Sequence, residues 1–186
     1  MNKNYIKITE TTLNILNNKL WHSVSLKEIK KKSQVKSFDK LINNNQELLK
    51  KINHYFDYEL SLVAVNIEKS NKKDMMFEIL MMRFDILQAN RKGIISIFDS
   101  FKQRPKELFF LLPDLLNSIL LMMNYAKFSS TGILGQLKTK GLFIIYISSF
   151  LVWLKDDTRS LEKTMISVDN YLDQADKILN FSKKYE

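Results

Sequence analysis

Apolar side chains recur every third or fourth residue between Leu49 and Ile67, and this spacing constrains the fold more than any other feature. The stripe consists of Leu49, Ile52, Phe56, Leu60, Val63 and Ile67. Steps of three and four residues place all six on one face of an α-helix, so a long helix is predicted over residues 46–69. With four Gly and two Pro in 186 residues, the chain has few turn formers for a sheet protein. The sequence therefore predicts an all-α fold.

Helical spacing elsewhere predicts about nine helices in total. The first is expected over residues 5–20. A second begins after Ser25, where Glu28 would complete a capping box, and a short third helix begins near Ser37. Beyond the segment EKSNKKD, where the apolar density rises, helices are predicted at residues 74–89, 91–101, 105–124, 134–155 and 159–182. Pro113 is expected to kink or split the helix that contains it.

Positive charge is concentrated in the first third of the chain. The net charge is +9, and residues 1–58 contain eleven Lys against five acidic residues. Lys outnumbers Arg 25 to 4, a bias typical of AT-rich coding sequence, which adds Lys without any demand for a binding surface. The distribution is therefore more informative than the total, and it favours an anionic partner for the N-terminal part.

Two short helices joined by a tight turn, after a longer helix, form a helix-turn-helix, whose second helix would lie in the major groove of DNA. The predicted DNA contacts are Lys27, Lys30, Lys31, Lys36, Ser37, Lys40, Asn43, Asn44 and Asn45. The lysines would contact phosphates, and the asparagines would hydrogen-bond to the DNA backbone or to base edges. The alternative is that the lysines form a solvated helix face and the asparagines an ordinary loop.

The segments ITETTLNIL, VSLKEIKKKSQV and ELLKKI resemble the TetR family of bacterial regulators in their order and approximate spacing. The resemblance implies a DNA-binding-like module in residues 1–55 and a helical ligand-binding and dimerisation domain in residues 56–186. Two departures concern the DNA-reading part. Gln34 stands where the family has Gly in the turn, and LINNN replaces an aromatic residue and a Lys after the recognition helix. Asp39 would face phosphates, which is unfavourable.

Four C-terminal segments carry a second resemblance: MMRFDILQANRKGI, LLNSILLMMNYAKF, GLFIIYISSFLVWLKDD and LEKTMISVDNYLDQA. They are similar to a TetR-like family common in α-proteobacteria and, more distantly, to the lipid-binding accessory protein of ubiquinone biosynthesis, which shares the TetR fold. Lys127 replaces a Gly of that accessory protein. A lipid-binding accessory protein that does not bind DNA therefore stays open as the alternative function.

Seven of the eight Met lie beyond residue 74, and flexible Met side chains can line a pocket for an irregular apolar ligand. The predicted pocket, for an apolar small molecule or lipid, is lined by Met81, Phe84, Phe98, Leu116, Met122, Met123, Phe143, Tyr146, Phe150 and Trp153. The alternative is a filled core without a cavity. Arg83 and Asp85, which flank Phe84, are expected to form a salt bridge at the helix surface or to meet a polar ligand head.

The last two predicted helices carry broad apolar faces. In TetR proteins the equivalent pair forms a four-helix dimer interface, so the resemblance implies a homodimer. Its candidate interface residues are Ile145, Ser149, Val152, Met165, Val168, Leu172 and Leu179.

No catalytic site, metal site or cofactor is predicted. Cys is absent and His22 and His54 are far apart in sequence, so a metal would depend on carboxylates. Asp156 and Asp157 are expected to cap the last helix, because neither a base nor a phosphate loop accompanies them. The longest apolar run, residues 141–154, is shorter than the roughly 18–20 residues that span a bilayer, and the N-terminus has no apolar signal segment.

The sequence therefore predicts a soluble, cytoplasmic, non-enzymatic protein. Helix order and charge placement favour a transcriptional regulator that binds double-stranded DNA as a dimer and responds to an apolar ligand.

Overall fold

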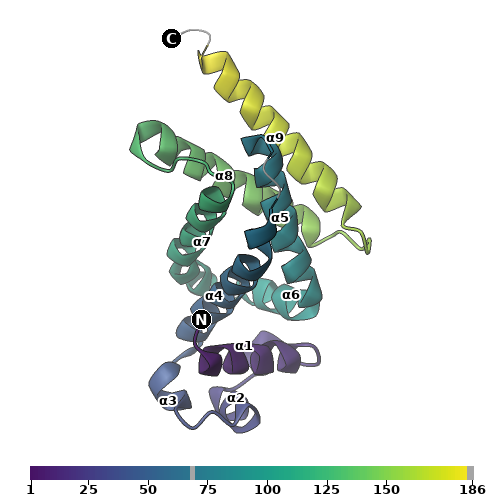
Figure 1. Cartoon of the computed structure of the whole chain (residues 1–186). Helices are drawn as coiled ribbons and strands as arrows, with labels where there is room; N and C mark the ends of the chain where they lie inside the picture. Colours follow the sequence, from purple (N-terminus) through teal and green to yellow (C-terminus); the bar gives the residue numbers. More distant parts are fainter. Residues whose placement is uncertain (68–69, 184–186) are drawn as a thin grey trace. The chain divides into compact units, whose positions relative to one another are not determined.

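The computed structural model describes residues 1–67 and 70–183, and within those ranges it consists of helices and contains no strand (Figure 1). The α-helices of this described part are α1 (Lys3–Leu16), α2 (Leu26–Ser33), α3 (Phe38–Leu41), α4 (Asn45–Val63), α5 (Lys72–Ala89), α6 (Arg91–Ser100), α7 (Pro105–Tyr125), α8 (Gly132–Trp153) and α9 (Glu162–Lys183). Two short 3-10 helices, η1 (Trp21–Ser23) and η2 (Ala64–Asn66), connect them. The predicted all-α fold is confirmed.

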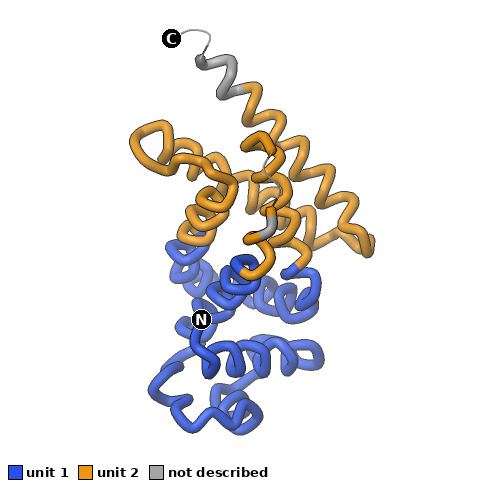
Figure 2. The backbone as a smooth tube through the Cα atoms, in the orientation of Figure 1, with its two compact units in different colours: residues 1–61, 86–115 blue, residues 62–85, 116–186 orange. Residues whose placement is uncertain are grey.

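The chain forms two compact units (Figure 2). Unit 1 consists of residues 1–61 and 86–115, and unit 2 of residues 62–85 and 116–186. Unit 1 therefore holds α1–α3, most of α4, α6 and the first half of α7. Unit 2 holds most of α5, the second half of α7, α8 and α9. The predicted division between residues 55 and 56 concerned function, and it stays a prediction.

The core of unit 1 includes the apolar faces of α1 and α4, where Ile8 and Leu48 are fully buried. Trp21 in η1 is also buried. Its backbone N–H donates to Ser96 Oγ in α6 at 2.7 Å, and its indole Nε1 donates to Glu107 Oε2 in α7 at 3.3 Å. These two bonds join the segment that precedes α2 to the helices on which it packs.

The predicted long helix is α4, and the apolar stripe buries Leu49, Ile52, Phe56 and Leu60 as the spacing requires. The helix ends at Val63 instead of continuing to residue 69, and η2 follows directly. Val63 is exposed, so the stripe stops being buried at the point where the helix ends. Periodicity alone extended the prediction beyond the part of the stripe that has a packing partner.

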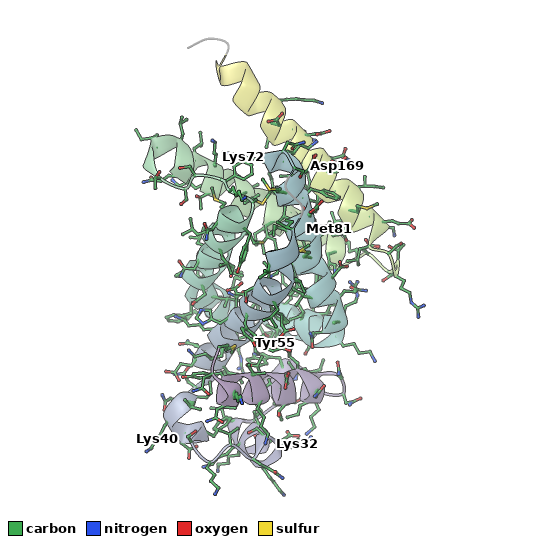
Figure 3. All side chains as sticks on the ribbon, viewed as in Figure 1. Lys32, Lys40, Tyr55, Lys72, Met81 and Asp169 are labelled. Atoms are coloured by element: carbon green, nitrogen blue, oxygen red, sulfur yellow. The ribbon has the colours of Figure 1, made fainter. Side chains whose placement is uncertain are left out.

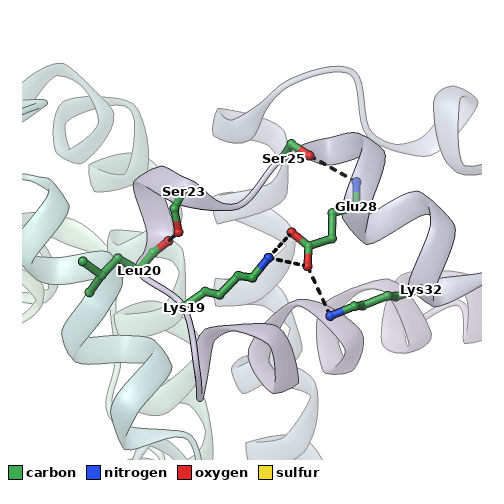
Figure 4. A network of polar contacts seen from close by, with 6 residues as sticks. All are labelled: Lys19, Leu20, Ser23, Ser25, Glu28 and Lys32. Carbon is green, nitrogen blue, oxygen red and sulfur yellow. Dashed lines mark hydrogen bonds and ion pairs between the residues drawn. The ribbon is translucent and has the colours of Figure 1, made fainter.

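The predicted capping box of α2 is half formed (Figure 4). Ser25 Oγ accepts a hydrogen bond from the backbone N–H of Glu28 at 3.2 Å. The Glu28 carboxylate does not reach back to the cap, because it accepts from Lys19 Nζ at 2.9 Å and lies 3.2 Å from Lys32 Nζ. Hydrogen bonds from Lys19 and Lys32 lower the pKa of Glu28. The Glu28–Lys19 pair thus attaches α2 to the segment that follows α1.

Gln34 ends α2 in the left-handed conformation, with φ 53° and ψ 27°. This is the turn position at which the family resemblance leads one to expect Gly. A residue with a side chain is strained in this region by roughly 1–2 kcal/mol, whereas Gly adopts it freely. The turn geometry is therefore kept although the residue that accommodates it best is missing.

Replacement of Gln34 by Gly is expected to stabilise the protein by about 1 kcal/mol, because it removes the left-handed strain. Thermal unfolding followed by circular dichroism would measure the change. The matched control is Gln174→Gly, an exposed residue within the right-handed α9, where the same substitution should destabilise by about 1 kcal/mol. Two changes of the same sign would contradict the assignment of strain to Gln34.

α7 is one continuous helix through Pro113, so the predicted split is wrong, whereas the predicted kink stays a prediction. Pro113 is exposed, and because proline has no backbone N–H it cannot donate a hydrogen bond to the Phe109 carbonyl. Among the described helices, α7 alone is long and apolar enough to cross a membrane, and 39% of the tested segment is buried. A single such helix is weak evidence for a membrane span, because the core helix of a soluble protein has the same length and composition.

The connection between α8 and α9 is organised by Asp156, which is fully buried in unit 2. Its Oδ2 accepts hydrogen bonds from the backbone N–H and the Oγ1 of Thr164, both at 2.8 Å. Its Oδ1 accepts from the Thr158 Oγ1 at 2.6 Å and the Thr158 N–H at 3.1 Å. Asp156 thus caps α9 as predicted, whereas the same role for Asp157 stays a prediction.

Candidate functional site

The helix-turn-helix of unit 1 consists of α2, the turn at Gln34 and α3, the predicted recognition helix, which has only four residues. Val35, Phe38 and Ile42 are buried, so they anchor α3 to the rest of the unit. The five lysines predicted to contact DNA are all exposed: Lys27, Lys30, Lys31, Lys36 and Lys40. Lys40 extends from α3 away from the ribbon (Figure 3).

One of these lysines is already paired. Lys30 in α2 forms an ion pair with Asp39 in α3, and both side chains are exposed. Asp39 is therefore not an isolated negative charge beside the predicted phosphates. One of the five lysines is already engaged in an ion pair within the chain. Ser37, which is half-buried, accepts a hydrogen bond from Asn4 Nδ2 at 3.3 Å. The start of α1 therefore holds the start of α3.

The asparagine segment before α4 has a clear local role. Asn44 Oδ1 accepts from the Glu47 N–H at 2.9 Å, and Glu47 Oε2 accepts from the Asn43 N–H at 2.7 Å. This reciprocal arrangement caps the N-terminus of α4. Asn43 and Asn44 remain exposed and Asn45 is half-buried, so the caps leave Asn43 and Asn44 at the surface. Their predicted contacts with DNA stay a prediction.

Unit 1 also joins α4 to α7 through a polar cluster. His54 Nε2 lies 3.0 Å from Asp114 Oδ1, and Lys50 Nζ lies 3.4 Å from Asp114 Oδ2. Asn53 Nδ2 donates to the Asp114 carbonyl at 3.3 Å. Within residues 1–67 and 70–183, no group of three or more His, Asp or Glu is placed to hold a metal ion.

The predicted pocket residues are spread over two environments. Phe98 belongs to unit 1, where its ring lies 6.5 Å from that of Phe101. The other nine belong to unit 2, and Phe84, Met122 and Trp153 are fully buried there. Met123 and Tyr146 are also buried, Met81, Phe143 and Phe150 are half-buried, and Leu116 is exposed. Phe84 stacks on Tyr146 at 5.7 Å, and Phe150 stacks on Trp153 at 5.3 Å.

Unit 2 contains an apolar groove of about 340 Å³, and the described residues that line it come from α5, α7, α8, α9 and the loop at Phe128. Of the ten predicted pocket residues, only Met123 is in this lining. Met76 is one of the methionines expected to line a pocket, whereas Ile145 and Leu172 were predicted at the dimer interface and the remaining lining residues were not predicted. Met76, Leu142 and Leu172 give the groove its apolar wall.

Arg83 lies in the interior of unit 2 and is 1% exposed. A salt bridge at the helix surface, one of its two expected roles, is therefore wrong for Arg83. Asp85, two residues further along α5, is exposed. The two side chains thus occupy different environments although they flank the same phenylalanine.

The predicted dimer residues are mostly directed into unit 2. Ile145, Ser149, Val168 and Leu172 are buried within the chain, Val152 is half-buried and Met165 is exposed. Leu179 lies outside the residues whose side chains the structure describes. Among the described side chains of these two helices, the exposed large apolar ones are instead Ile133, Leu134, Leu137, Ile144 and Leu151 of α8, with Met165 and Ile166 of α9.

No protein-family model matches the sequence, and no curated protein matches it. Among solved structures, the crystal structure of the TetR transcriptional regulator from Nitrosomonas europaea is similar, with a TM-score of 0.74. The similarity covers 92% of this chain and 97% of that chain at 15% sequence identity. At this identity the likeness establishes a TetR-like fold.

Proposed function

We propose that the protein is a TetR-like transcriptional regulator that binds double-stranded DNA as a homodimer and responds to a small ligand. The observation that carries the proposal is the helix-turn-helix of unit 1, with its left-handed turn at Gln34 and five exposed lysines on and around α2 and α3. Lysines supply point charges for phosphate contacts, and these contacts provide most of the affinity of proteins for duplex DNA.

The short recognition helix determines the kind of binding expected. With four residues, α3 offers Asp39 and Lys40 as its polar side chains, and Asp39 is paired with Lys30. Few groups can therefore reach base edges, so phosphate contacts from Lys36 and Lys40 should dominate. Modest sequence selectivity and a steep dependence on salt follow from this balance.

A dimer is supported by the apolar surface of α8 and α9. Exposed apolar side chains recur along α8 at Ile133, Leu137, Ile144 and Leu151, and α9, which packs on α8, exposes Ile166 near its start. Monomeric proteins seldom leave such an extended apolar stripe in water. Burial against a second copy would remove it and would present two helix-turn-helix heads to one duplex.

The test is fluorescence anisotropy with a labelled duplex from the region upstream of the protein's own gene, measured over a series of salt concentrations. Replacement of Lys36 and Lys40 by Gln should weaken binding about tenfold and reduce the slope of log K against log salt by about one for each phosphate that is no longer neutralised. Replacement of Asp39 by Asn should strengthen binding, because it releases Lys30 and removes a negative charge beside the phosphates.

The matched control is Lys155→Gln with Lys163→Gln, which removes the same charge from exposed positions of unit 2. This control should leave the DNA affinity within about twofold of wild type. A flat salt response, or equal reductions of affinity in the test and control variants, would contradict the proposed DNA-binding surface.

A further inference from the structure

The groove of unit 2 has the composition of a site for an apolar chain. Its volume of about 340 Å³ lies near the lower end of the roughly 300–1,000 Å³ typical of small-molecule pockets. Met76, Met123 and Leu172 in its wall are buried and come from α5, α7 and α9. Two of these three are methionines, whose flexible and polarisable side chains adapt to an irregular apolar ligand. The groove is therefore preformed and apolar.

Gly141 lines the groove at a point where the space beside the backbone is open. It lies inside α8, where Gly is disfavoured relative to Ala, and it belongs to the groove lining. A Cβ added at Gly141 would meet no atom within 4 Å, so no close packing requires the missing side chain. Gly135, on the same helix, differs: a Cβ there would lie 2.3 Å from the backbone carbon of Ser130. Close packing therefore explains why position 135 is Gly. It does not explain why position 141 is Gly, because the space beside that position is open.

The polar edge of the groove is cationic. Lys73, Lys138 and Lys140 line it, and Asp176 supplies the carboxylate among the described lining residues. Lys73 forms an ion pair with Asp173 of α9, and its Nζ lies 3.8 Å from Oδ1 of Asp169 on the same helix. Within the described part of the chain, Lys138 and Lys140 have no hydrogen bond or ion pair. Two lysines without a described partner therefore line a mainly apolar groove, together with Lys73 and Asp176.

We propose that this groove binds a free single-chain amphiphile with an anionic head, of the alkyl carboxylate class. The alkyl chain occupies the space beside Gly141, against Met76, Met123 and Leu172. The carboxylate lies at the edge and accepts charge-assisted hydrogen bonds from Lys138 and Lys140. This ligand class is that of the regulator proposed above. The proposal rests on that function only for the biological role of the ligand and not for its binding to the groove.

The test is isothermal titration of the full chain, without DNA, with laurate, dodecanol and dodecylamine. These probes share one alkyl chain and differ in the charge of the head. Laurate should bind most tightly and dodecylamine least. Lys138→Gln with Lys140→Gln should weaken laurate binding roughly fivefold or more and leave dodecanol within about twofold, because only the charged head loses partners.

A second variant blocks the chain instead of the head. Gly141→Phe should abolish binding of both laurate and dodecanol, because the ring would occupy the open space. Gly141→Ala, whose methyl group meets no neighbour, should retain binding and serves as the folding control. The pair Lys155→Gln and Lys163→Gln, which lies outside the groove lining, controls for the loss of net charge. Equal laurate affinity in wild type and Gly141→Phe would overturn the proposal.

Two other occupants of the groove, a membrane surface and a second copy of the chain, would give different results. Binding to vesicles that contain phosphatidylglycerol, without binding of free laurate, would show a membrane surface and overturn the proposal. If laurate fails to bind and Gly141→Phe dissociates a dimer in sedimentation experiments, the groove is an interface between copies of the chain, which also overturns it. Laurate binding by a protein that does not bind DNA would uphold the groove and contradict the regulator.

Discussion

Replacement of Asp156 by Asn is expected to destabilise the protein by about 3 kcal/mol, one of the two largest effects that we predict for a substitution. The fully buried carboxylate accepts hydrogen bonds from the N–H and the Oγ1 of both Thr158 and Thr164. Asn keeps one oxygen and places an NH₂ group against donors that need an acceptor. A buried donor left unpaired costs about 1–3 kcal/mol, and the helix cap is weakened in addition. Urea and thermal unfolding would measure the loss.

The same substitution should change how stability depends on pH. Burial raises the pKa of Asp156, but the hydrogen bonds from Thr158 and Thr164 outweigh burial and hold the pKa at about 2, below its ordinary 3.8. A lowered folded-state pKa contributes stability that is fully present above the unfolded-state value and is lost as the pH falls from about 4 to about 2. The contribution is about 2 kcal/mol. The stability difference between wild type and Asp156→Asn should therefore shrink over this interval.

The control for both measurements is Asp169→Asn, which removes the same charge from an exposed position on α9. Its ion pair with Lys73 is long and solvated, so the expected change is within about 0.5 kcal/mol. A stability difference for Asp156→Asn that stays constant between about pH 6 and about pH 2.5 would show that the charge of Asp156 does not contribute to the cap.

The parts of the fold that depend on local chemistry were predictable from the sequence. The spacing of Leu49, Ile52, Phe56 and Leu60 defines a helical face whatever packs against it, and Ser25 caps α2 through its own neighbour in sequence. Elements that depend on tertiary partners were predicted less well. α4 ends at Val63, an exposed member of the apolar stripe, and periodicity cannot register this end.

The proposed DNA-binding surface was predictable only in outline. Exposure of the lysines on α2 follows from helix geometry. Ile29 points toward the core of unit 1, so the residues beside it in the sequence point away from that core. The pairing of Lys30 with Asp39 depends on how the turn at Gln34 brings α3 back against α2. The two residues are nine positions apart, and the sequence alone does not indicate that they are in contact. The same turn decides how many cations remain available for phosphates.

The faces of α8 could not be assigned from the sequence, because nearly every residue between Leu142 and Trp153 is apolar and no period distinguishes one side from the other. Ile145 was predicted at the dimer surface and is buried in unit 2, whereas its neighbour Ile144 is 64% exposed. The groove was missed for a related reason. Lys73 and Leu172 are far apart in the sequence, and only the folded unit places them around Gly141.

The exposed apolar stripe gives the second large expected effect. Replacement of Leu151 and Ile166 by Glu should raise the dissociation constant of the proposed dimer more than about 100-fold, as measured by sedimentation velocity over a concentration series. The two side chains are 47% and 58% exposed in the single chain, so each has substantial apolar surface left to bury. In a two-fold symmetric interface every substitution occurs twice, which doubles its energetic effect. Glu would also place a charge where water is excluded.

Leu151 and Ile166 are suited to this experiment because neither lines the groove of unit 2, so dissociation of the dimer can be separated from failure to bind the ligand. The matched control is Phe109→Glu with Phe110→Glu, which replaces two exposed apolar residues on α7 by the same charged residue. The control should sediment as wild type does. If both double variants sediment alike, the apolar stripe of α8 and α9 is not the surface that joins two copies. Because one duplex engages both heads only in a dimer, a monomeric variant with unchanged DNA affinity would show that each head binds alone.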